Sequence, residues 1–291
     1  MSLRLEMLQV ARLAPTVLGP EATALVEKFI SARQNEDGGF QDRAARSDLY
    51  YTVFALDGLA ALQRPLPLEK LRFFLLGFAE GEALDFVHTC CLARLWSYFP
   101  ETERPENLLG KIENWRTRDG GYNQRAGAAH TSAYGAMLAG AGYLDWKRKP
   151  PRSWRLALSL RCLRTADGAW ANEPGMKEGS TPATAAAVTF YRQLRLTPPA
   201  ELGDWLLAQA HPQGGFKAFP GAPVPDLLST AVALHALDGL QVDFSHLKES
   251  LLDFVDTLWS AEGGFHAHWA DESLDVEYTY YGLLALGHLS L

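Results

Sequence analysis

Five basic side chains lie where the sequence could bind an anionic group. Arg43 follows the glycine turn in GGFQDR, and Arg125 has the same register after GGYNQ. Arg46 stands three residues beyond Arg43, and His88 and His130 each directly precede a threonine. A guanidinium can bind phosphate through two hydrogen bonds, and the N–H groups at a helix start add further donors. These residues favour a phosphate-binding site, provided that the fold brings them to one rim.

Acidic residues recur beside these cations. An aspartate stands four residues before a threonine at Asp48, Asp85, Asp226 and Asp275. A carboxylate in this position can cap a helix start and complement the helix dipole. If several helices start at one rim, the same acids line a shared cavity. In a second interpretation, the basic residues contact solvent or acids nearby in the sequence: Asp42, Asp48 and Asp119.

The elements that position these residues recur along the chain. A glycine turn ending in an aromatic residue occurs at 38–40, 120–122, 168–170, 214–216 and 263–265. An amphipathic segment precedes each turn, and a threonine opens a more uniformly apolar segment after it. A sixth apolar segment, from Thr89, lacks the turn. Because a helix that is apolar on most sides must be surrounded by protein, the pattern predicts an all-α fold, an (α/α)6 toroid of six inner and six outer helices.

The predicted organisation is a single domain. A short N-terminal helix occupies residues 1–14, and the repeats cover about 20–64, 65–104, 105–147, 150–197, 198–243 and 244–291. Glycine permits the positive φ that a tight turn between helices often needs. The aromatic residue that follows can pack over the turn.

Composition narrows the class of protein. The chain has 291 residues, 47% of them apolar, so it can bury a large core. The net charge of −7 argues against a nucleic-acid binder that relies on general phosphate neutralisation. Three cysteines make no disulfide framework and favour a reducing compartment. Since no apolar run reaches the ~18 residues of a membrane span, we expect a soluble, cytoplasmic protein without a nucleic-acid partner.

Aromatic side chains are frequent on the predicted inner helices. They include Tyr50, Tyr51, Phe54, Tyr278 and Tyr281. Core packing is the usual role of such residues, but six helices cannot close a ring without leaving a central space. Walls of tyrosine and phenylalanine suit an isoprenoid chain, and their π faces can stabilise a carbocation. The sequence therefore predicts an aromatic-lined cavity for an apolar ligand.

The repeats resemble the superfamily of protein prenyltransferase β subunits and squalene–hopene-type cyclases, over nearly the whole chain. The closest local similarity is to the prenyltransferase β subunits. In those proteins a GGFxGR turn precedes Asp-x-Cys-Tyr, and the next unit contains Asp-Phe-x-His-Thr. The corresponding segments here are GGFQDRAARSDLYY and LDFVHTCC. The resemblance implies a protein that binds an isoprenyl diphosphate in a central cavity and transfers the prenyl group, together with a helical α-type subunit as partner.

The resemblance also implies roles for individual residues. Arg43, Arg46 and Tyr51 match positions that hold the diphosphate, with Arg125 and His130 extending the basic rim. The segment YTYYGLLAL matches a family segment but stands at the end of the chain. The site would therefore combine the sixth, first and second repeats. The aromatic residues expected against the hydrocarbon are Phe54, Tyr278 and Tyr281.

A metal site follows from the same resemblance. Asp48 and His88 match two zinc ligands of the family, whereas the cysteine ligand position is Tyr50. Cys90 and Cys91 could replace that ligand only if one turned inward, and we expect both to be buried as small apolar residues. The family's diphosphate histidine is Asp275 here, where a Mg²⁺ ion would have to separate the acid from a diphosphate.

Two other functions remain open. LDVEYT resembles the DxDDT motif of class II terpene cyclases, whose middle acid protonates an alkene. Glu277 would be that acid, Asp275 its neighbour, and Tyr278 replaces the last aspartate. Such an acid must remain protonated and yet strongly acidic. The last alternative is a non-catalytic binding or scaffold protein with the same fold.

Overall fold

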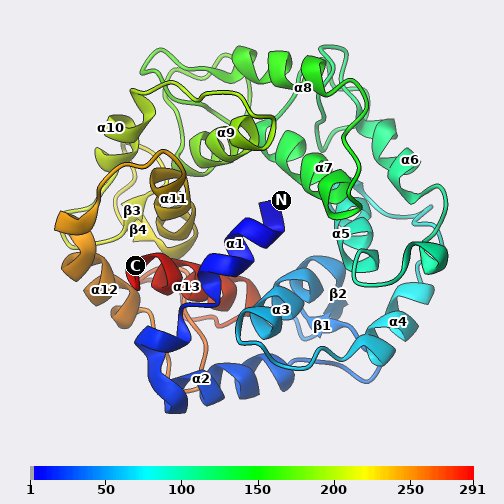
Figure 1. Ribbon diagram of the computed structural model, residues 1–291, viewed down its shortest axis with the longest axis horizontal. Coiled ribbons are helices and arrows are strands. Elements are labelled where there is room, and N and C mark those ends of the chain that lie inside the picture. The colour runs from blue at the N-terminus through cyan, green and yellow to red at the C-terminus, as the bar shows by residue number, and fades with distance from the viewer. Residues whose placement is uncertain (1–2) are drawn as a thin grey trace.

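Apolar helices form the inner wall of a ring, and amphipathic helices form its outside (Figure 1). The computed structural model describes residues 3–291. Within that range the inner wall consists of α3 (Leu49–Ala61), α5 (Phe86–Trp96), α7 (Ala133–Asp145), α9 (Thr181–Gln193), α11 (Leu227–Gly239) and α13 (Val276–Leu289). These helices carry alanine, leucine and aromatic residues on most sides, and most of these side chains are buried.

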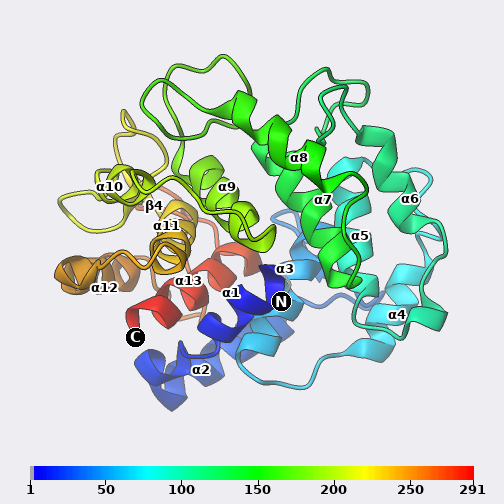
Figure 2. The ribbon, with the colours of Figure 1, turned by 45° about the horizontal axis from the view of Figure 1, so that its top comes forward.

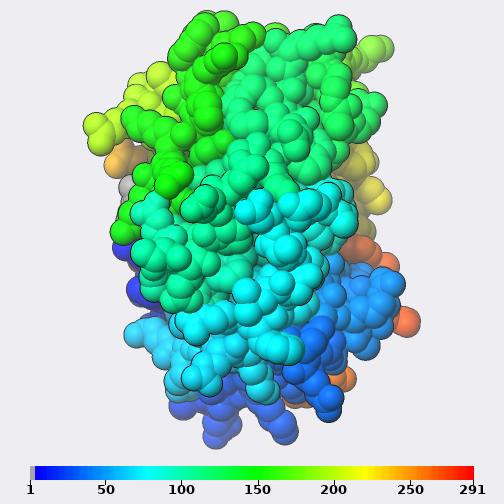
Figure 3. Space-filling model, turned by 90° about the vertical axis from the view of Figure 1, so that its right-hand side faces the viewer, coloured from blue at the N-terminus to red at the C-terminus, as the bar shows by residue number. Residues whose placement is uncertain are grey.

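Each inner helix has an outer partner that precedes it in the chain. The outer helices are α2 (Pro15–Ser31), α4 (Leu68–Leu76), α6 (Leu108–Ile112), α8 (Ser153–Ser159), α10 (Leu202–Leu207) and α12 (Lys248–Thr257). Short 3-10 segments lie at η1 (Glu101–Glu103), η2 (Glu113–Trp115), η3 (Leu160–Leu163) and η4 (Ser245–Leu247). Seen from the side of α4 and α6, the packed atoms form a continuous wall (Figure 3). The predicted all-α toroid is confirmed.

The glycine turns join each repeat to the next one. Gly38, Gly214 and Gly263 all have φ near +90°, at +94°, +89° and +94°. A Cβ atom at any of them would overlap a carbonyl oxygen of the following outer helix, at Lys70, Ser250 and Leu25 respectively. The contact of Gly263 is with α2, the first outer helix. The last repeat therefore packs against the first, and this contact helps to close the ring.

Replacing Gly263 by alanine should lower the free energy of unfolding by more than about 1 kcal/mol, because the residue combines a positive φ with a close backbone approach. Gly127→Ala is the matched control, since Gly127 has a φ of +74° but no atom within 4 Å of the added Cβ. Urea denaturation of both variants measures the difference. Equal losses would show that the contact with α2 contributes nothing beyond the backbone strain.

At four of the five glycine turns a threonine ties the turn to the start of its inner helix, and the exception is the turn at Tyr122, where Thr131 bonds to Asp119 instead. The backbone N–H of Phe40 donates to Oγ1 of Thr52 over 2.9 Å, and Phe216 does the same to Thr230 over 2.9 Å. Two antiparallel ribbons accompany these contacts. They are β1 (Phe40–Gln41) with β2 (Ser47–Asp48), and β3 (Phe216–Lys217) with β4 (Pro225–Asp226). The repeated threonine therefore fixes where these four turns meet their helices.

The recurrent acids cap the inner helices. Asp48, Asp85, Asp226 and Asp275 each accept hydrogen bonds from backbone N–H groups in the first turn. The capping interpretation therefore holds at all four positions. The helix starts that they cap all lie at one end of the ring, so these carboxylates also surround its mouth.

One further helix, α1 (Leu3–Ala11), lies inside the ring (Figures 1 and 2). It packs against α13, α3, α7 and α9. Arg4 forms an ion pair of 2.8 Å with Asp57, and Glu6 lies 3.8 Å from Arg192. Because Asp57 and Arg192 belong to the later turns of α3 and α9, α1 closes the end of the ring where the inner helices finish.

Candidate active site

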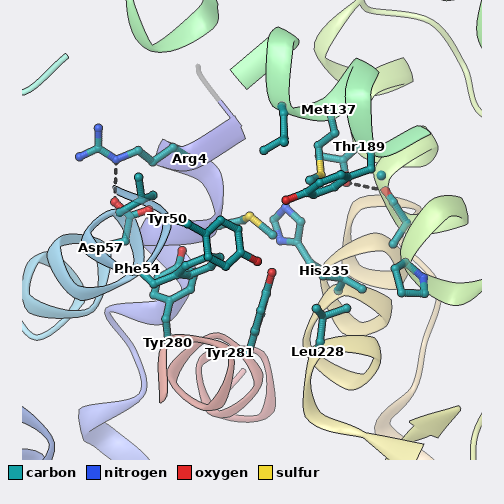
Figure 4. A pocket seen from close by; sticks show the side chains of 18 of the residues that line it. Arg4, Tyr50, Phe54, Asp57, Met137, Thr189, Leu228, His235, Tyr280 and Tyr281 are labelled. Carbon is teal, nitrogen blue, oxygen red and sulfur yellow. Dashed lines mark hydrogen bonds and ion pairs between the residues drawn. The ribbon is translucent and has the colours of Figure 1, made fainter. Parts of the chain in front are cut away.

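The ring encloses a cavity of about 380 Å³, a size typical of small-molecule sites. Its wall carries Tyr50, Phe54, Tyr134, Tyr280 and Tyr281 (Figure 4). The rings of Tyr50, Phe54, Tyr280 and Tyr281 contact one another, with centroid separations of 5.0 Å between Tyr50 and Phe54 and 5.5 Å between Phe54 and Tyr281. Such a wall excludes water from an apolar chain and can stabilise a positive charge that develops on it.

Polar groups form the floor of this cavity. Asp57 accepts hydrogen bonds from Arg4, Arg94 and Tyr98 at 2.8, 3.2 and 3.0 Å. Arg94 also lies 3.4 Å from Asp145. The two guanidiniums are thus matched by two carboxylates, and α1 is fastened to the ring through this network.

A buried carboxylic acid, Glu277, adjoins the cavity wall through Tyr50 and does not itself line the cavity. Glu277 is only 9% exposed, and the hydroxyl of Tyr50 donates to its Oε1 over 2.6 Å. Burial, with the nearby charge of Asp275, raises the pKa of Glu277 to about 7. Glu277 lies one helical turn before Tyr281, so both side chains share a face of α13. The group can hold a proton at neutral pH beside an aromatic chamber, which is what a general acid requires.

Arg43 is held by two acids from the last repeat. Its guanidinium forms ion pairs of 2.8 Å with Asp271 and 2.7 Å with Asp275. It also lies 5.6 Å above the ring of Tyr278. The sixth and first repeats therefore do meet at the mouth. There Arg43 and Tyr278 adjoin Asp275, outside the wall of the cavity itself.

The remaining cations of the rim are mostly exposed. Arg46 pairs with Asp42 at 3.0 Å, and Arg125 lies 3.5 Å from Glu173. His130 is 3.7 Å from Asp119 and borders a separate shallow pocket together with Arg125. These residues are therefore not gathered with Arg43 into one cluster. Tyr51 is half-buried near the mouth, and it does not line the cavity either.

His88 lies between two carboxylates. Its Nε2 is 2.9 Å from Oδ2 of Asp48, and its Nδ1 is 2.9 Å from Asp85. The hydrogen bond to Asp48, with that to Asp85, raises the pKa of His88 to about 9. Although burial opposes it, the contact with His88 holds the pKa of Asp48 below its usual value. The histidine is thus a charged imidazolium at neutral pH.

Zinc does not fit these side chains. Both ring nitrogens of His88 already contact carboxylates, and the hydroxyl of Tyr50 is directed to Glu277. Cys90 and Cys91 are both buried in α5, as expected, and Cys91 lies in the wall of the central cavity. Within residues 3–291, no group of three or more histidine, cysteine, aspartate or glutamate side chains could hold a metal ion. We therefore derive no step through a metal.

The ion pair of His88 should make stability depend on pH. The folded pKa of His88, about 9, exceeds the ordinary value of 6.5. The contribution is therefore complete below pH 6.5 and is lost as the pH rises through 9. Urea denaturation at pH 6.5 and 9.5 should show a smaller loss of stability for His88→Gln than for the wild type. An equal loss in both proteins would contradict the assignment.

Several residues of the cavity escaped the sequence analysis. His235 belongs to its wall, and Arg4, Asp57 and Arg94 belong to its floor. The signal for three of them was present, because His235, Asp57 and Arg94 interrupt helices that are otherwise apolar. A polar residue on a buried helix needs a partner or a function. The part played by α1 had no comparable signal.

Solved structures with the same architecture bind isoprenoid ligands. The type II terpene cyclase MstE from Scytonema, in complex with geranylgeranyl dihydroxybenzoate, is 15% identical with a TM-score of 0.61, over 99% of this chain and 98% of that one. The protein geranylgeranyltransferase-I of Candida albicans, complexed with GGPP, is 14% identical with a TM-score of 0.59, over 92% and 90%. At such identities the likeness shows the fold alone.

A family model matches the sequence directly. The prenyltransferase alpha-alpha toroid domain matches residues 20–114 and 183–290, which is more than half of the chain. No curated protein matches the sequence. None of the helices in residues 3–291 is both long and apolar enough to cross a membrane. The repeats, the ring and the family model agree, and the chain belongs to the prenyltransferase alpha-alpha toroid family.

Proposed function

We propose that the protein binds an isoprenoid chain in its central cavity and starts a cyclisation by protonating that chain from Glu277. The observation that carries this proposal is a buried acid that is hydrogen-bonded to Tyr50, an aromatic residue of the cavity wall. The pKa of about 7 leaves much of this carboxyl protonated at neutral pH. Its hydrogen-bond partner, Tyr50, is itself part of the chamber wall.

The chemistry needs only groups of this chain and water. The carboxyl proton of Glu277 moves to one carbon of a C=C bond, and the neighbouring carbon becomes a cation. A second C=C bond attacks that cation and closes a ring. The final cation loses a proton to water and becomes an alkene, and the Glu277 carboxylate takes up a proton from water before the next turnover. The hydroxyl of Tyr50 stabilises the carboxylate that remains, so it makes the buried acid stronger than burial alone would leave it.

The similar structures support this reaction class. The Scytonema protein is named as a type II terpene cyclase with a geranylgeranyl ligand, and this chain covers 98% of its length. A single toroid of this size is therefore enough for such an activity. The residues around Glu277 differ from the DxDDT motif of class II terpene cyclases, since Tyr278 stands at the position of the last aspartate.

Prenyl transfer from an isoprenyl diphosphate is the second candidate, favoured by the GGPP complex of the Candida albicans enzyme. The residues at the mouth of the cavity support prenyl transfer less well than cyclisation. Arg43 contacts Asp271 and Asp275, and Arg46 contacts Asp42, so a diphosphate would have to displace these carboxylates or recruit Mg²⁺. If the protein is a prenyltransferase, its partner would be the helical α-type subunit that the resemblance implies.

Product analysis distinguishes the candidates. Purified protein is incubated with geranylgeraniol, squalene or geranylgeranyl diphosphate, with and without thiol and aromatic acceptors. A cyclic product of unchanged mass, detected by gas chromatography and mass spectrometry, supports cyclisation. Release of pyrophosphate with a prenylated acceptor supports transfer. Ligand retained in native mass spectrometry without either product would instead support a non-catalytic binding protein.

A further inference from the structure

His235 places a buried imidazole in the wall of the central cavity. It belongs to α11, seven residues beyond Leu228 at the mouth, so it starts about 10 Å deeper at 1.5 Å per residue. The residue is only 4% exposed, and Figure 4 shows its ring extending from α11 toward the middle of the cavity. Its Nε2 atom has no hydrogen-bond partner within residues 3–291. A buried polar atom without a partner calls for an explanation.

Whether Nε2 donates or accepts a hydrogen bond depends on whether the other ring nitrogen, Nδ1, carries the proton. Nδ1 of His235 lies 3.1 Å from Nε2 of His288. Nδ1 of His288 has no hydrogen-bond partner in the part of the chain that the structure describes, and Oδ2 of the half-exposed Asp238 lies 3.9 Å from it. A carboxylate favours the proton on the nitrogen that faces it. His288 then accepts at Nε2, His235 donates from Nδ1, and Nε2 of His235 keeps a free lone pair. Burial lowers the pKa of His235 to about 4, so the ring is neutral at neutral pH.

We infer that Nε2 of His235 accepts a hydrogen bond from a hydroxyl group of the ligand, and that this ligand is an uncharged prenyl alcohol bound with its hydroxyl end deep in the cavity. The inference rests on the proposed function, because it takes the ligand to be an isoprenoid. A hydrocarbon end would leave the lone pair of Nε2 unpaired, whereas a hydroxyl would give it a partner.

The charges at the mouth favour the same ligand. Arg43 contacts two carboxylates there, and His88 contacts two others. Two carboxylates therefore surround each of these cations. Their combined charge is negative, and it would repel a diphosphate. With the hydroxyl at His235, the terminal alkene of the chain lies toward the mouth. This is the end of the cavity where Glu277 stands.

The preference can be measured with three probes that differ at one end: geranylgeraniol, the aldehyde geranylgeranial and the corresponding tetraene hydrocarbon. Their affinities are compared by displacement of a fluorescent isoprenoid. The alcohol should bind about tenfold more tightly than the other two, because only it can donate to an acceptor. In His235→Leu the three affinities should become equal. Val232→Ala, one turn earlier on the same wall, should weaken all three alike and keep the preference.

His235→Leu leaves His288 without its partner, so a second variant and a second readout protect the test against misfolding. In His288→Leu, His235 is free to carry its proton on Nε2, and binding of the aldehyde should rise toward that of the alcohol. Nitrogen-15 NMR of the ligand-free wild type should show the His235 proton on Nδ1. A proton on Nε2 would overturn the acceptor assignment.

The remaining outcomes are also decisive. Equal binding of the three probes by the wild type would overturn the hydroxyl site and leave the isoprenoid cavity intact. Tight binding of both the alcohol and the aldehyde would mean that Nε2 donates. If none of the probes bound, the proposed function would fail and this inference with it.

Discussion

Glu277→Gln should lower the rate of isoprenoid cyclisation by at least about a hundredfold, because a positioned general acid contributes roughly 10²–10⁴ in rate. Glutamine has nearly the same shape, and its oxygen can still accept from the hydroxyl of Tyr50, 2.6 Å from the native carboxyl. The cavity should therefore keep its form and its affinity. Steady-state rates and equilibrium binding of the same isoprenoid separate the two effects. Unchanged turnover in the variant would remove Glu277 from the mechanism.

The pH profile gives a second view of the same group. Because the pKa of Glu277 is raised to about 7, the acid form predominates below that pH and falls about tenfold for each unit above it. The rate should follow this fall. Tyr50→Phe removes the hydrogen bond that favours the carboxylate, so the pKa of Glu277 should rise and the break in the profile should move to higher pH. A rate independent of pH between 6 and 8 would contradict the assignment.

The repeating parts of the fold were predictable because they rest on local devices. A glycine with positive φ, an aromatic residue and a threonine that accepts the aromatic's N–H recur within about 14 residues, so their spacing appears in the sequence. The aspartate before each threonine caps the helix that it precedes. Gly263 shows the limit of such patterns, because nothing around it reveals that its neighbour is Leu25 at the other end of the chain.

The partners of the charged residues were not predictable in the same way. Arg43 and Asp275 are 232 residues apart, and they meet only because the ring closes. The sequence predicts that Arg43 binds a diphosphate or contacts an acid nearby in the chain, whereas in the structure Arg43 contacts two acids from the last repeat. Tyr50 occupies a cysteine position of the related enzymes, and its contact with Glu277 likewise crosses this closing seam. The charge balance of the mouth therefore depends on long-range geometry.

Substitutions in the floor of the cavity should destabilise the fold more than substitutions elsewhere in the molecule. Asp57→Ala should lower the free energy of unfolding by about 3–5 kcal/mol, because removing one partner of a buried ion pair leaves an uncompensated charge. Asp57 is 2% exposed and accepts from Arg4, Arg94 and Tyr98, so its loss leaves two buried cations with one carboxylate, Asp145, which contacts Arg94. Urea denaturation at neutral pH measures the change.

An exposed pair supplies the matched control for Asp57. Asp42→Ala breaks the 3.0 Å contact with Arg46 on the surface and should cost at most about 1 kcal/mol. The two variants should also differ in the behaviour of α1. Since Arg4 holds this helix to the ring through Asp57, Asp57→Ala should speed hydrogen exchange in residues 3–11 and cleavage by proteases near that segment. Protection of α1 equal to that of the wild type would show that apolar packing, rather than the ion pair, keeps this end of the cavity closed.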